Sequence, residues 1–332
     1  MKFSTSFKAA WWLNNPHLQT IYPSLFRKIE DHHQSWRERM ITPDNDFLDI
    51  DFVGTGVRPL VILIHGLAGS SQSGYIRGLQ HVLDKQGFRS AALNFRGCSG
   101  ELNNLARCYH SGDTDDIDFL YKTIRQREPD TAIAMVGFSL GGNALLKWLG
   151  EQGQSVDVFA ACAVSVPFVL SACATKLDSG FSLIYRKNLI DELKVYMQDK
   201  HLHLKGIGNE AEALKIAQLG DLSKIKSFWQ YDNQVVAKLY GFSGVDDYYQ
   251  QSSSKQYLKA IEIPTLLIQS ADDPFMTKHV IPLHDEISSS VSLEITAKGG
   301  HVGFVMGHNP FSPIYWLEQR IPDFLQLQLC KN

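Results

Sequence analysis

Cysteine is scarce in this sequence, and its few cysteines lack the spacing of a metal site or a disulfide framework. Their number is odd and no two of them form a CxxC pair, so neither a zinc site nor a disulfide-stapled fold is expected. We expect reduced thiols, a cytoplasmic location, and no metal or other cofactor. The cysteines are Cys98, Cys108, Cys162, Cys173 and Cys330.

The sequence also has no excess of basic residues. Its 32 lysines and arginines face 35 aspartates and glutamates, which gives a net charge of −3 and an isoelectric point of about 6.5. Proteins that bind nucleic acid or an anionic membrane surface carry clustered positive charge. Neither partner is therefore expected.

Long apolar runs are missing as well. The N-terminus has no sustained apolar region of the kind found in signal peptides. The most apolar stretch, residues 158–174, contains Pro167 and two serines. We interpret this stretch as a buried strand followed by a loop rather than as a membrane span, so no integral membrane segment is expected.

The chain is long and apolar enough to form a large core, and strand-like and helix-like segments alternate along it. Its 332 residues, 44% of them hydrophobic, are enough to bury a large core. After two short strands within residues 40–53, apolar strand-like runs alternate with helix-like segments. This order predicts an α/β fold with a mostly parallel, doubly wound sheet. The expected strands are residues 60–64, 88–95, 131–136 and 156–166, and the expected helices are 75–86, 113–127 and 140–150.

The alternation stops near residue 170. Residues 183–198, 210–219 and 227–240 all have helical patterns, and strands resume only at 265–269 and 291–296 before a last helix over 313–327, interrupted by Pro322. We therefore predict an N-terminal segment with the first strands (1–58), an α/β core (59–170 and 256–332) and a helical lid insertion (171–255).

The strongest chemical signal is a G-x-S-x-G motif at residues 137–141, with Ser139 at its centre. An apolar strand precedes the motif and a helix follows it, which is the context of a nucleophile elbow. Such a turn raises the serine hydroxyl above the sheet. The flanking glycines are needed because a Cβ at either position would clash with the neighbouring strand and helix.

A second loop, residues 65–70, follows the buried strand 60–64. Acyl transfer needs two N–H donors for the oxyanion of the tetrahedral intermediate. We predict the backbone N–H groups of Leu67 and Leu140 for this role. A phosphate-binding loop would need a lysine after Gly69, and none is there. His65 is interpreted as a structural histidine that shapes the loop.

A serine nucleophile needs a base, and the base needs a carboxylate to hold its tautomer. His301 lies in a glycine-rich loop after the last expected strand, and the chain order Ser–Asp–His fits the fold. Asp272 and Asp273 both follow a buried strand. We prefer Asp273, because its offset from the strand end matches the usual spacing and Pro274 restricts the turn, but Asp272 stays open.

Other polar residues give weaker signals. Arg96 either braces the loops near the site or is a solvated charge, and His110 is interpreted as structural. The pairs His32–His33 and His201-x-His203 have no companion cluster, so no metal ligands are proposed. Neither Cys98 nor Cys108 stands beside a base, which disfavours a cysteine nucleophile.

Taken jointly, the motifs resemble the YheT-like hydrolases of the α/β-hydrolase superfamily, the branch that includes animal acylglycerol lipases and yeast medium-chain ester synthases/esterases. The similarity runs from about residue 11 to residue 325. It implies a Ser139–Asp273–His301 triad and activity on carboxylic esters. The animal relatives carry an N-terminal membrane anchor, and nothing before Trp11 is long enough to span. The segments that carry the resemblance are residues 15–20 (Asn-Pro-His-Leu-Gln-Thr), 65–70 (His-Gly-Leu-Ala-Gly-Ser), 94–97 (Asn-Phe-Arg-Gly), 109–112 (Tyr-His-Ser-Gly), 137–143 (Gly-Phe-Ser-Leu-Gly-Gly-Asn) and 272–275 (Asp-Asp-Pro-Phe).

The expected function is hydrolysis of carboxylic esters, of short- to medium-chain acyl esters or acylglycerols, through an acyl-enzyme on Ser139. The expected partner is thus a small-molecule acyl ester. Two alternatives remain at this level: acyl transfer to a small alcohol by the same three residues, and a catalytically idle hydrolase fold that binds a ligand. Aromatic residues of the lid either line an apolar acyl pocket or only pack the lid onto the core.

Overall fold

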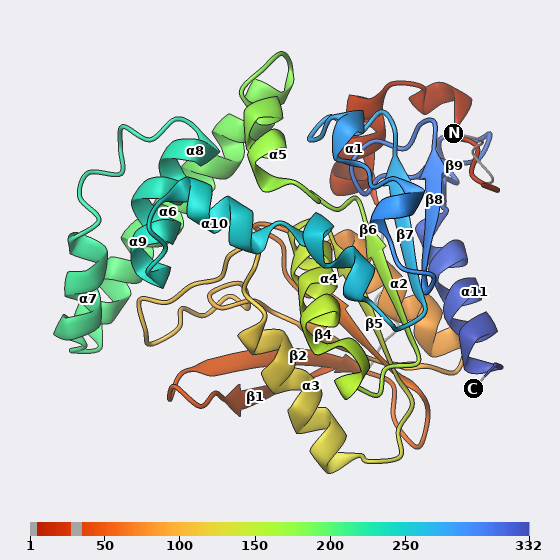
Figure 1. Ribbon diagram of the computed structural model, residues 1–332, viewed down its shortest axis with the longest axis horizontal. Coiled ribbons are helices and arrows are strands. Elements are labelled where there is room, and N and C mark those ends of the chain that lie inside the picture. Colours follow the sequence, from red (N-terminus) through yellow and green to blue (C-terminus); the bar gives the residue numbers. More distant parts are fainter. Residues whose placement is uncertain (1–4, 28–34, 332) are drawn as a thin grey trace.

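A single eight-stranded sheet forms the centre of the protein (Figure 1). The computed structural model describes residues 5–27 and 35–331. The strand order is β1-β2-β4-β3-β5-β6-β7-β8. All neighbours from β4 to β8 pair in parallel, whereas β2 is antiparallel to both of its neighbours, β1 and β4. This confirms the predicted mostly parallel α/β sheet. The strands are β1 (Ser35–Ile41), β2 (Phe47–Val53), β3 (Leu60–Ile64), β4 (Arg89–Leu93), β5 (Ile133–Phe138), β6 (Ala160–Val164), β7 (Thr265–Ser270) and β8 (Val291–Thr296).

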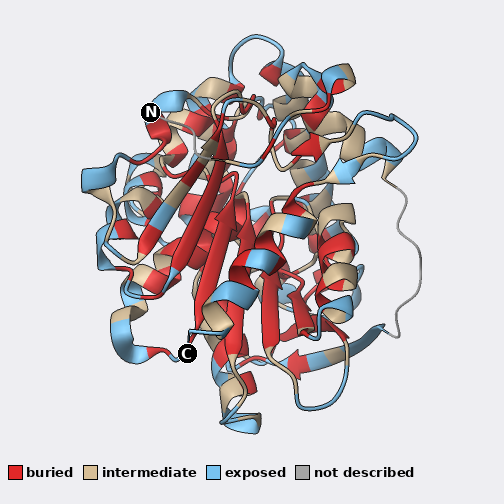
Figure 2. Cartoon of the chain, turned by 90° about the vertical axis from the view of Figure 1, so that its right-hand side faces the viewer, coloured by how far each residue is buried: buried red, intermediate tan, exposed pale blue. Residues whose placement is uncertain are grey.

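Helices cover both faces of the sheet, which is why the central strands are apolar along their whole length. In β3, Leu60 and Ile62 join the apolar cluster that contains residues of α3 and α4, while Val61 and Leu63 join the cluster on the opposite face, with α2 and α11. Figure 2 shows these strands as buried throughout. The bounds of these helices are α2 (Gly74–Lys85), α3 (Asp115–Arg127), α4 (Leu140–Gln152) and α11 (Leu317–Leu329).

Between β6 and β7 the chain forms a block of helices that lies to one side of the sheet (Figure 1). This block has an apolar cluster of its own, which includes Ile190, Met197 and Leu204. We refer to it as the lid, and its exact boundaries stay a prediction. Its elements are α5 (Leu170–Leu177), α6 (Ser182–Gly206), α7 (Glu210–Ala217), α8 (Phe228–Tyr231), a π-helical turn (Asp232–Val236), α9 (Ala237–Tyr240) and α10 (Val245–Ser252).

Short helices account for most differences from the predicted elements. Both α5 and α10 have eight residues, too few for a clear period. The first expected strand begins earlier, at Ser35. The expected helix 227–240 is divided by the π-helical turn. The remaining elements are α1 (Pro16–Phe26), the 3₁₀ turns at Trp11–Leu13, Gly153–Ser155, Ser254–Ala260, Lys278–Val280 and His284–Glu286, and the small strands β9 (Val305–Met306) and β10 (Ile314–Tyr315).

The expectation that Pro322 interrupts the last helix is wrong. Helix α11 runs through Pro322 without a break and begins at Leu317, because Ile314 and Tyr315 pair with β9 instead. Pro322 stands in the second turn of α11, so the proline removes only one backbone hydrogen bond, to the carbonyl of Glu318. Its ring is buried, and packing of the helix against the sheet offsets that loss.

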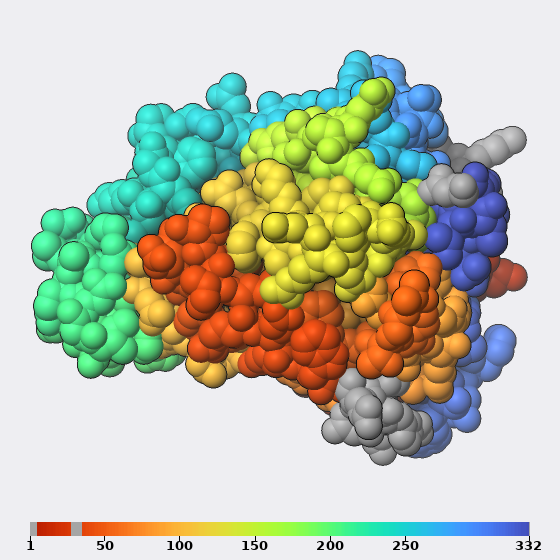
Figure 3. Space-filling view, turned by 90° about the horizontal axis from the view of Figure 1, so that it is seen from below, coloured from red at the N-terminus to blue at the C-terminus, as the bar shows by residue number. Residues whose placement is uncertain are grey.

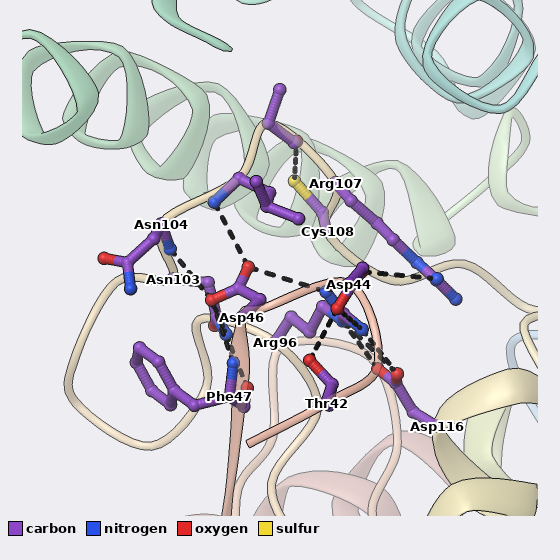
Figure 4. A network of polar contacts seen from close by, with 12 residues as sticks. Thr42, Asp44, Asp46, Phe47, Arg96, Asn103, Asn104, Arg107, Cys108 and Asp116 are labelled. Carbon is purple, nitrogen blue, oxygen red and sulfur yellow. Dashed lines mark hydrogen bonds and ion pairs between the residues drawn. The ribbon is translucent and has the colours of Figure 1, made fainter. Parts of the chain in front are cut away.

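A buried ion-pair network ties the loop after β4 to the β1–β2 turn and to the start of α3 (Figure 4). The Arg96 side chain is 2% exposed. Its guanidinium donates to Asp116 at 2.9 Å and to Asp44 at 2.8 Å, and lies 3.5 Å from Asp46. The segments that carry these carboxylates adjoin on the surface as well, where the red-orange β1–β2 region borders the yellow α3 region (Figure 3). Arg96 is therefore a brace, and the solvated-charge reading is wrong.

Replacing Arg96 by methionine is expected to lower the free energy of unfolding by about 3–5 kcal/mol, because buried carboxylates then lose their counter-charge. The matched control is Arg127→Met. Arg127 pairs with Glu38 at the surface, where such pairs contribute about 0–1 kcal/mol. Urea-induced unfolding of both variants measures the difference. Equal small losses in the two variants would contradict the bracing role.

Candidate active site

Ser139 stands on a strained turn between β5 and α4. Its φ is +51°, a value that costs a non-glycine residue free energy and is found mostly where function requires it. A Cβ on Gly137 would lie 2.6 Å from the carbonyl oxygen of Gly141, and a Cβ on Gly141 would lie 2.3 Å from the carbonyl oxygen of His65. The turn can therefore form only with glycine on both sides of the serine.

The same close approach predicts the effect of Gly141→Ala. The added methyl group overlaps backbone atoms of the loop after β3, so a strand or a helix must move, which typically costs about 1–3 kcal/mol of unfolding free energy. Gly206→Ala is the matched control, because a Cβ there meets no atom within 4 Å and alanine favours a helix. Urea unfolding should show a loss for the first variant and none for the second.

His301 links Ser139 to a carboxylate. Its Nε2 lies 2.9 Å from Oγ of Ser139, and its Nδ1 lies 2.9 Å from Oδ2 of Asp273. Since a carboxylate only accepts hydrogen bonds, Nδ1 carries the proton and Nε2 is left to accept from the serine hydroxyl. The imidazole is stacked on the Phe275 ring, with 4.2 Å between ring centroids.

The two neighbouring aspartates, Asp272 and Asp273, have different hydrogen-bond partners. Asp273 contacts His301 directly, and its other oxygen, Oδ1, accepts from the backbone N–H of Phe275 at 2.8 Å. Asp272 instead accepts from the backbone N–H of Gly300 at 3.0 Å. Asp273 is thus the carboxylate positioned to orient the imidazole, and Asp272 supports the loop that carries it.

The loop of His301 is held in a strained conformation by neighbouring elements. Val302 has a φ of +58°, which is unfavourable for a β-branched residue. Its N–H donates to Oγ of Ser165 at 3.0 Å, and the N–H of His301 donates to Oγ1 of Thr20 at 2.9 Å. Ser165 itself has a φ of +53°. Strained residues therefore surround the serine and histidine, and side chains from α1 and from the residue that follows β6 hold the His301 loop in place.

The two predicted oxyanion donors line the same cavity as Ser139. Leu140 is the first residue of α4, so its N–H has no carbonyl one turn earlier in that helix. In the other loop, the amides on both sides of Leu67 are held by phenols: Gly66 donates to Tyr75 and Ala68 to Tyr109, each at 2.9 Å. This arrangement is compatible with an oxyanion hole, and the role itself stays a prediction.

His65 is buried and makes two local hydrogen bonds. Its Nε2 accepts from the N–H of Phe95 at 3.1 Å, and its Nδ1 lies 2.7 Å from the carbonyl oxygen of Gly66. Burial lowers the pKa of His65 to about 4. The ring is therefore neutral near pH 7 and joins the loop after β3 to the loop after β4, in agreement with a structural role.

His110 is also buried, against the rings of Tyr240 and Tyr248. Burial, with Lys147 and Arg107 nearby, lowers its pKa from 6.5 to about 3. The unfolded chain therefore binds a proton below pH 6.5 that the folded chain does not bind, so stability falls as the pH falls. At pH 5 this single group costs about 2 kcal/mol.

We expect His110→Asn to reduce the difference in melting temperature between pH 7 and pH 5. Asparagine keeps an acceptor for the N–H of Gly112, which Nδ1 of His110 now binds at 3.1 Å, but does not titrate. The same substitution at the exposed His284 serves as the control and should leave the acid sensitivity as it is. An unchanged pH dependence in His110→Asn would contradict this assignment.

A cavity of about 560 Å³ opens at Ser139 and His301. Its walls come from α1, from the loops after β3 and β5, and from the lid helices, and they are mostly apolar. That volume is in the range of small-molecule binding sites. The lid side chains that line the cavity are Leu170, Cys173, Ala174, Leu177, Tyr185, Leu189, Phe228, Asp232 and Tyr249.

Sequence reasoning missed the contribution of α1. The motif at residues 15–20 contains two helix-start signals, since Asn15 caps the helix with its side chain and Pro16 follows at the first position. Thr20 of this helix holds the His301 loop. The buried Gln19 side chain donates to the carbonyl oxygen of Val305 and accepts from its N–H. The capping pattern could have revealed the helix but not what it contacts.

Neither a metal cluster nor a membrane-spanning helix is found among residues 5–27 and 35–331. No group of three or more His, Cys, Asp or Glu side chains there could hold a metal ion. His32 and His33 lie outside the described residues. No helix in the described part of the chain is long and apolar enough to cross a membrane.

Comparison with known proteins places this geometry in a family. A family model described as "alpha/beta hydrolase fold" matches residues 59–307. The chain belongs to the α/β-hydrolase fold family. The Escherichia coli (strain K12) protein named "Putative esterase YheT" is 37% identical over 320 residues, which cover 95% of this chain and 92% of that protein. This confirms the resemblance to YheT-like hydrolases.

More distant relatives agree with this α/β-hydrolase assignment. "Phospholipase ABHD3" of Homo sapiens is 28% identical over 286 residues, which cover 85% of this chain and 68% of that protein. Among solved structures, the Pyrococcus furiosus esterase Pf2001 matches with a TM-score of 0.57 and 16% identity, over 97% of this chain and 98% of that chain. At such an identity the likeness shows the fold alone.

Proposed function

We propose that this α/β hydrolase is a carboxylic ester hydrolase that acts through an acyl-enzyme on Ser139. The observation that carries the proposal is the hydrogen-bonded line from Ser139 through His301 to Asp273, with 2.9 Å at each step. Ser139 and His301 line a mostly apolar cavity. Relatives named as an esterase and a phospholipase support the reaction class.

In the first half-reaction, Oγ of Ser139 attacks the acyl carbonyl carbon while Nε2 of His301 takes the hydroxyl proton. The carbonyl oxygen becomes an oxyanion, and the N–H groups of Leu67 and Leu140 donate to it. The intermediate then collapses. His301 gives its proton to the leaving alcohol oxygen, and the acyl group remains on Ser139 as an ester.

In the second half-reaction, water replaces the alcohol. His301 takes a proton from the water as its oxygen attacks the acyl carbon, and the same two N–H groups bind the second oxyanion. Ser139 leaves with the proton returned by His301, so the free enzyme and a carboxylic acid result. Throughout, the Asp273 carboxylate stabilises the imidazolium and keeps its Nδ1 proton in place.

The cavity favours esters with an apolar acyl chain. Its walls near Ser139 include Leu170, Leu177 and Leu189 of the lid and Ile21 of α1, and burying a methylene against such side chains contributes about 0.8 kcal/mol. A volume of about 560 Å³ suits a short- to medium-chain acyl ester. The lid aromatics Tyr185 and Phe228 line this space and also pack within the lid.

A fluorophosphonate probe tests the proposal, because it modifies only activated serines. We expect stoichiometric labelling, with mass spectrometry placing the adduct on the peptide that contains Ser139. Hydrolysis of p-nitrophenyl esters of graded acyl length should be inhibited in parallel with labelling. A protein that takes up no probe while natively folded would overturn the proposal and favour a catalytically idle fold.

A further inference from the structure

One acidic residue lines the part of the cavity that the lid forms. Asp232 is the only aspartate or glutamate among the described residues that line it. Asp232 opens the π-helical turn after α8, and π-helical turns are rare and concentrate at functional sites. It stands four residues after Phe228, which also lines the cavity, so the two side chains share one face of the helix.

Tyr249 of α10 holds the carboxylate of Asp232. Its hydroxyl donates to Oδ2 at 2.6 Å. The other oxygen, Oδ1, has no hydrogen-bond partner in the described part of the chain, and it is not among the fully buried unpartnered atoms there, so it keeps some exposure. In that part of the chain no lysine, arginine or histidine acts on the Asp232 carboxylate, whose pKa is affected only by burial and by the hydrogen bond from Tyr249. Because Asp232 lines the cavity, this unpaired oxygen is available to a hydrogen-bond donor on a bound molecule.

We propose that Asp232, positioned by Tyr249, is a polar subsite of the lid that binds a hydroxyl group on the ester substrate. This inference rests on the proposed ester hydrolysis at Ser139, because both residues line one cavity. A hydroxyl can donate to the open oxygen of the carboxylate. An ester that lacks the hydroxyl removes water from this second oxygen without giving it a partner, which is costly.

A neutral hydroxyl fits this position better than a cation. Burial raises the pKa of Asp232 to about 7, so its surroundings disfavour a charge. A quaternary ammonium group would have to lose its hydration to enter, and its attraction to the carboxylate only partly offsets that loss. A hydroxyl can also accept from the protonated acid, so it can bind on both sides of pH 7.

The test compares esters that differ only in hydroxyl groups. 1-Octanoylglycerol is paired with propyl octanoate for a hydroxyl on the alcohol portion, and methyl 8-hydroxyoctanoate is paired with methyl octanoate for one on the acyl chain. The variant is Asp232→Leu/Tyr249→Phe, which removes both polar partners with little change in shape, a replacement that can be nearly neutral for folding. Asp246→Leu, an exposed lid position, is the matched control.

We expect wild type and Asp246→Leu to favour the hydroxyl ester of at least one pair by about tenfold or more in kcat/KM. The ratio should fall to near one in the double variant, while turnover of the ester without hydroxyl persists. A ratio that is near one in wild type, or that survives in the double variant, overturns the subsite but leaves ester hydrolysis in place. The subsite is also overturned if the double variant loses more kcat/KM on octanoylcholine than on the hydroxyl esters. Failure of the proposed ester hydrolysis at Ser139 would show differently, as activity that persists in Ser139→Ala.

Discussion

Ser139→Ala is expected to lower kcat for ester hydrolysis by about 10⁴- to 10⁶-fold and to abolish fluorophosphonate labelling. Alanine cannot form the acyl-enzyme, so hydrolysis has to proceed by direct attack of water. The loss is this large because the acyl group has no alternative attachment point near His301. Initial rates on a p-nitrophenyl ester measure it.

The substitution should have little effect on the fold. Within residues 5–27 and 35–331 the Ser139 side chain hydrogen-bonds only to His301, and the strained φ of +51° is not relieved by alanine. The unfolding free energy should therefore stay within about 0.5 kcal/mol of wild type, as for substitutions that break no buried network. Ser289→Ala, at an exposed serine, controls for the assay. Retention of more than about one-hundredth of wild-type kcat in Ser139→Ala would contradict nucleophilic catalysis by this residue.

The core of the fold could be predicted because its elements have strong local patterns. Residues 60–64 are a continuous apolar run and residues 265–269 contain the apolar run 266–268, and the structure places β3 and β7 there. The lid was harder to predict. Helix α6 extends to Gly206 because Met197 and Leu204 pack into the lid cluster, a tertiary contact that no period in a short window reveals.

The candidate site divides in the same way. Ser139 and His301 stand in loops whose glycines and flanking strands mark them in the sequence, so their approach could be expected. The distance of Asp272 and Asp273 from the end of the strand gives only a preference for one of them as the partner of His301. Adjacent residues on a turn point in different directions, and only the structure shows which one reaches the imidazole. Asp232 could not have been selected, since its importance depends on how α8 and α10 pack together.

Asp273→Asn and Asp272→Asn form the pair of variants that separates the two neighbouring carboxylates. Asp273 accepts from Nδ1 of His301 at 2.9 Å. An amide at that position can turn its NH₂ group towards the ring, which favours the tautomer with the proton on Nε2. Nε2 then cannot take the proton of Ser139. We expect Asp273→Asn to lower kcat by about 10⁴-fold with little change in KM.

Asp272→Asn should lower kcat by less than about tenfold, since the asparagine carbonyl oxygen can still accept from the N–H of Gly300 that Asp272 binds at 3.0 Å. Burial raises the pKa of Asp272, so a neutral side chain is tolerated there. Kinetics of both variants on one p-nitrophenyl ester, with circular dichroism to check folding, give the comparison. A larger loss in Asp272→Asn than in Asp273→Asn would assign the orienting carboxylate to residue 272, and the mechanism would then require the His301 loop to rearrange when substrate binds.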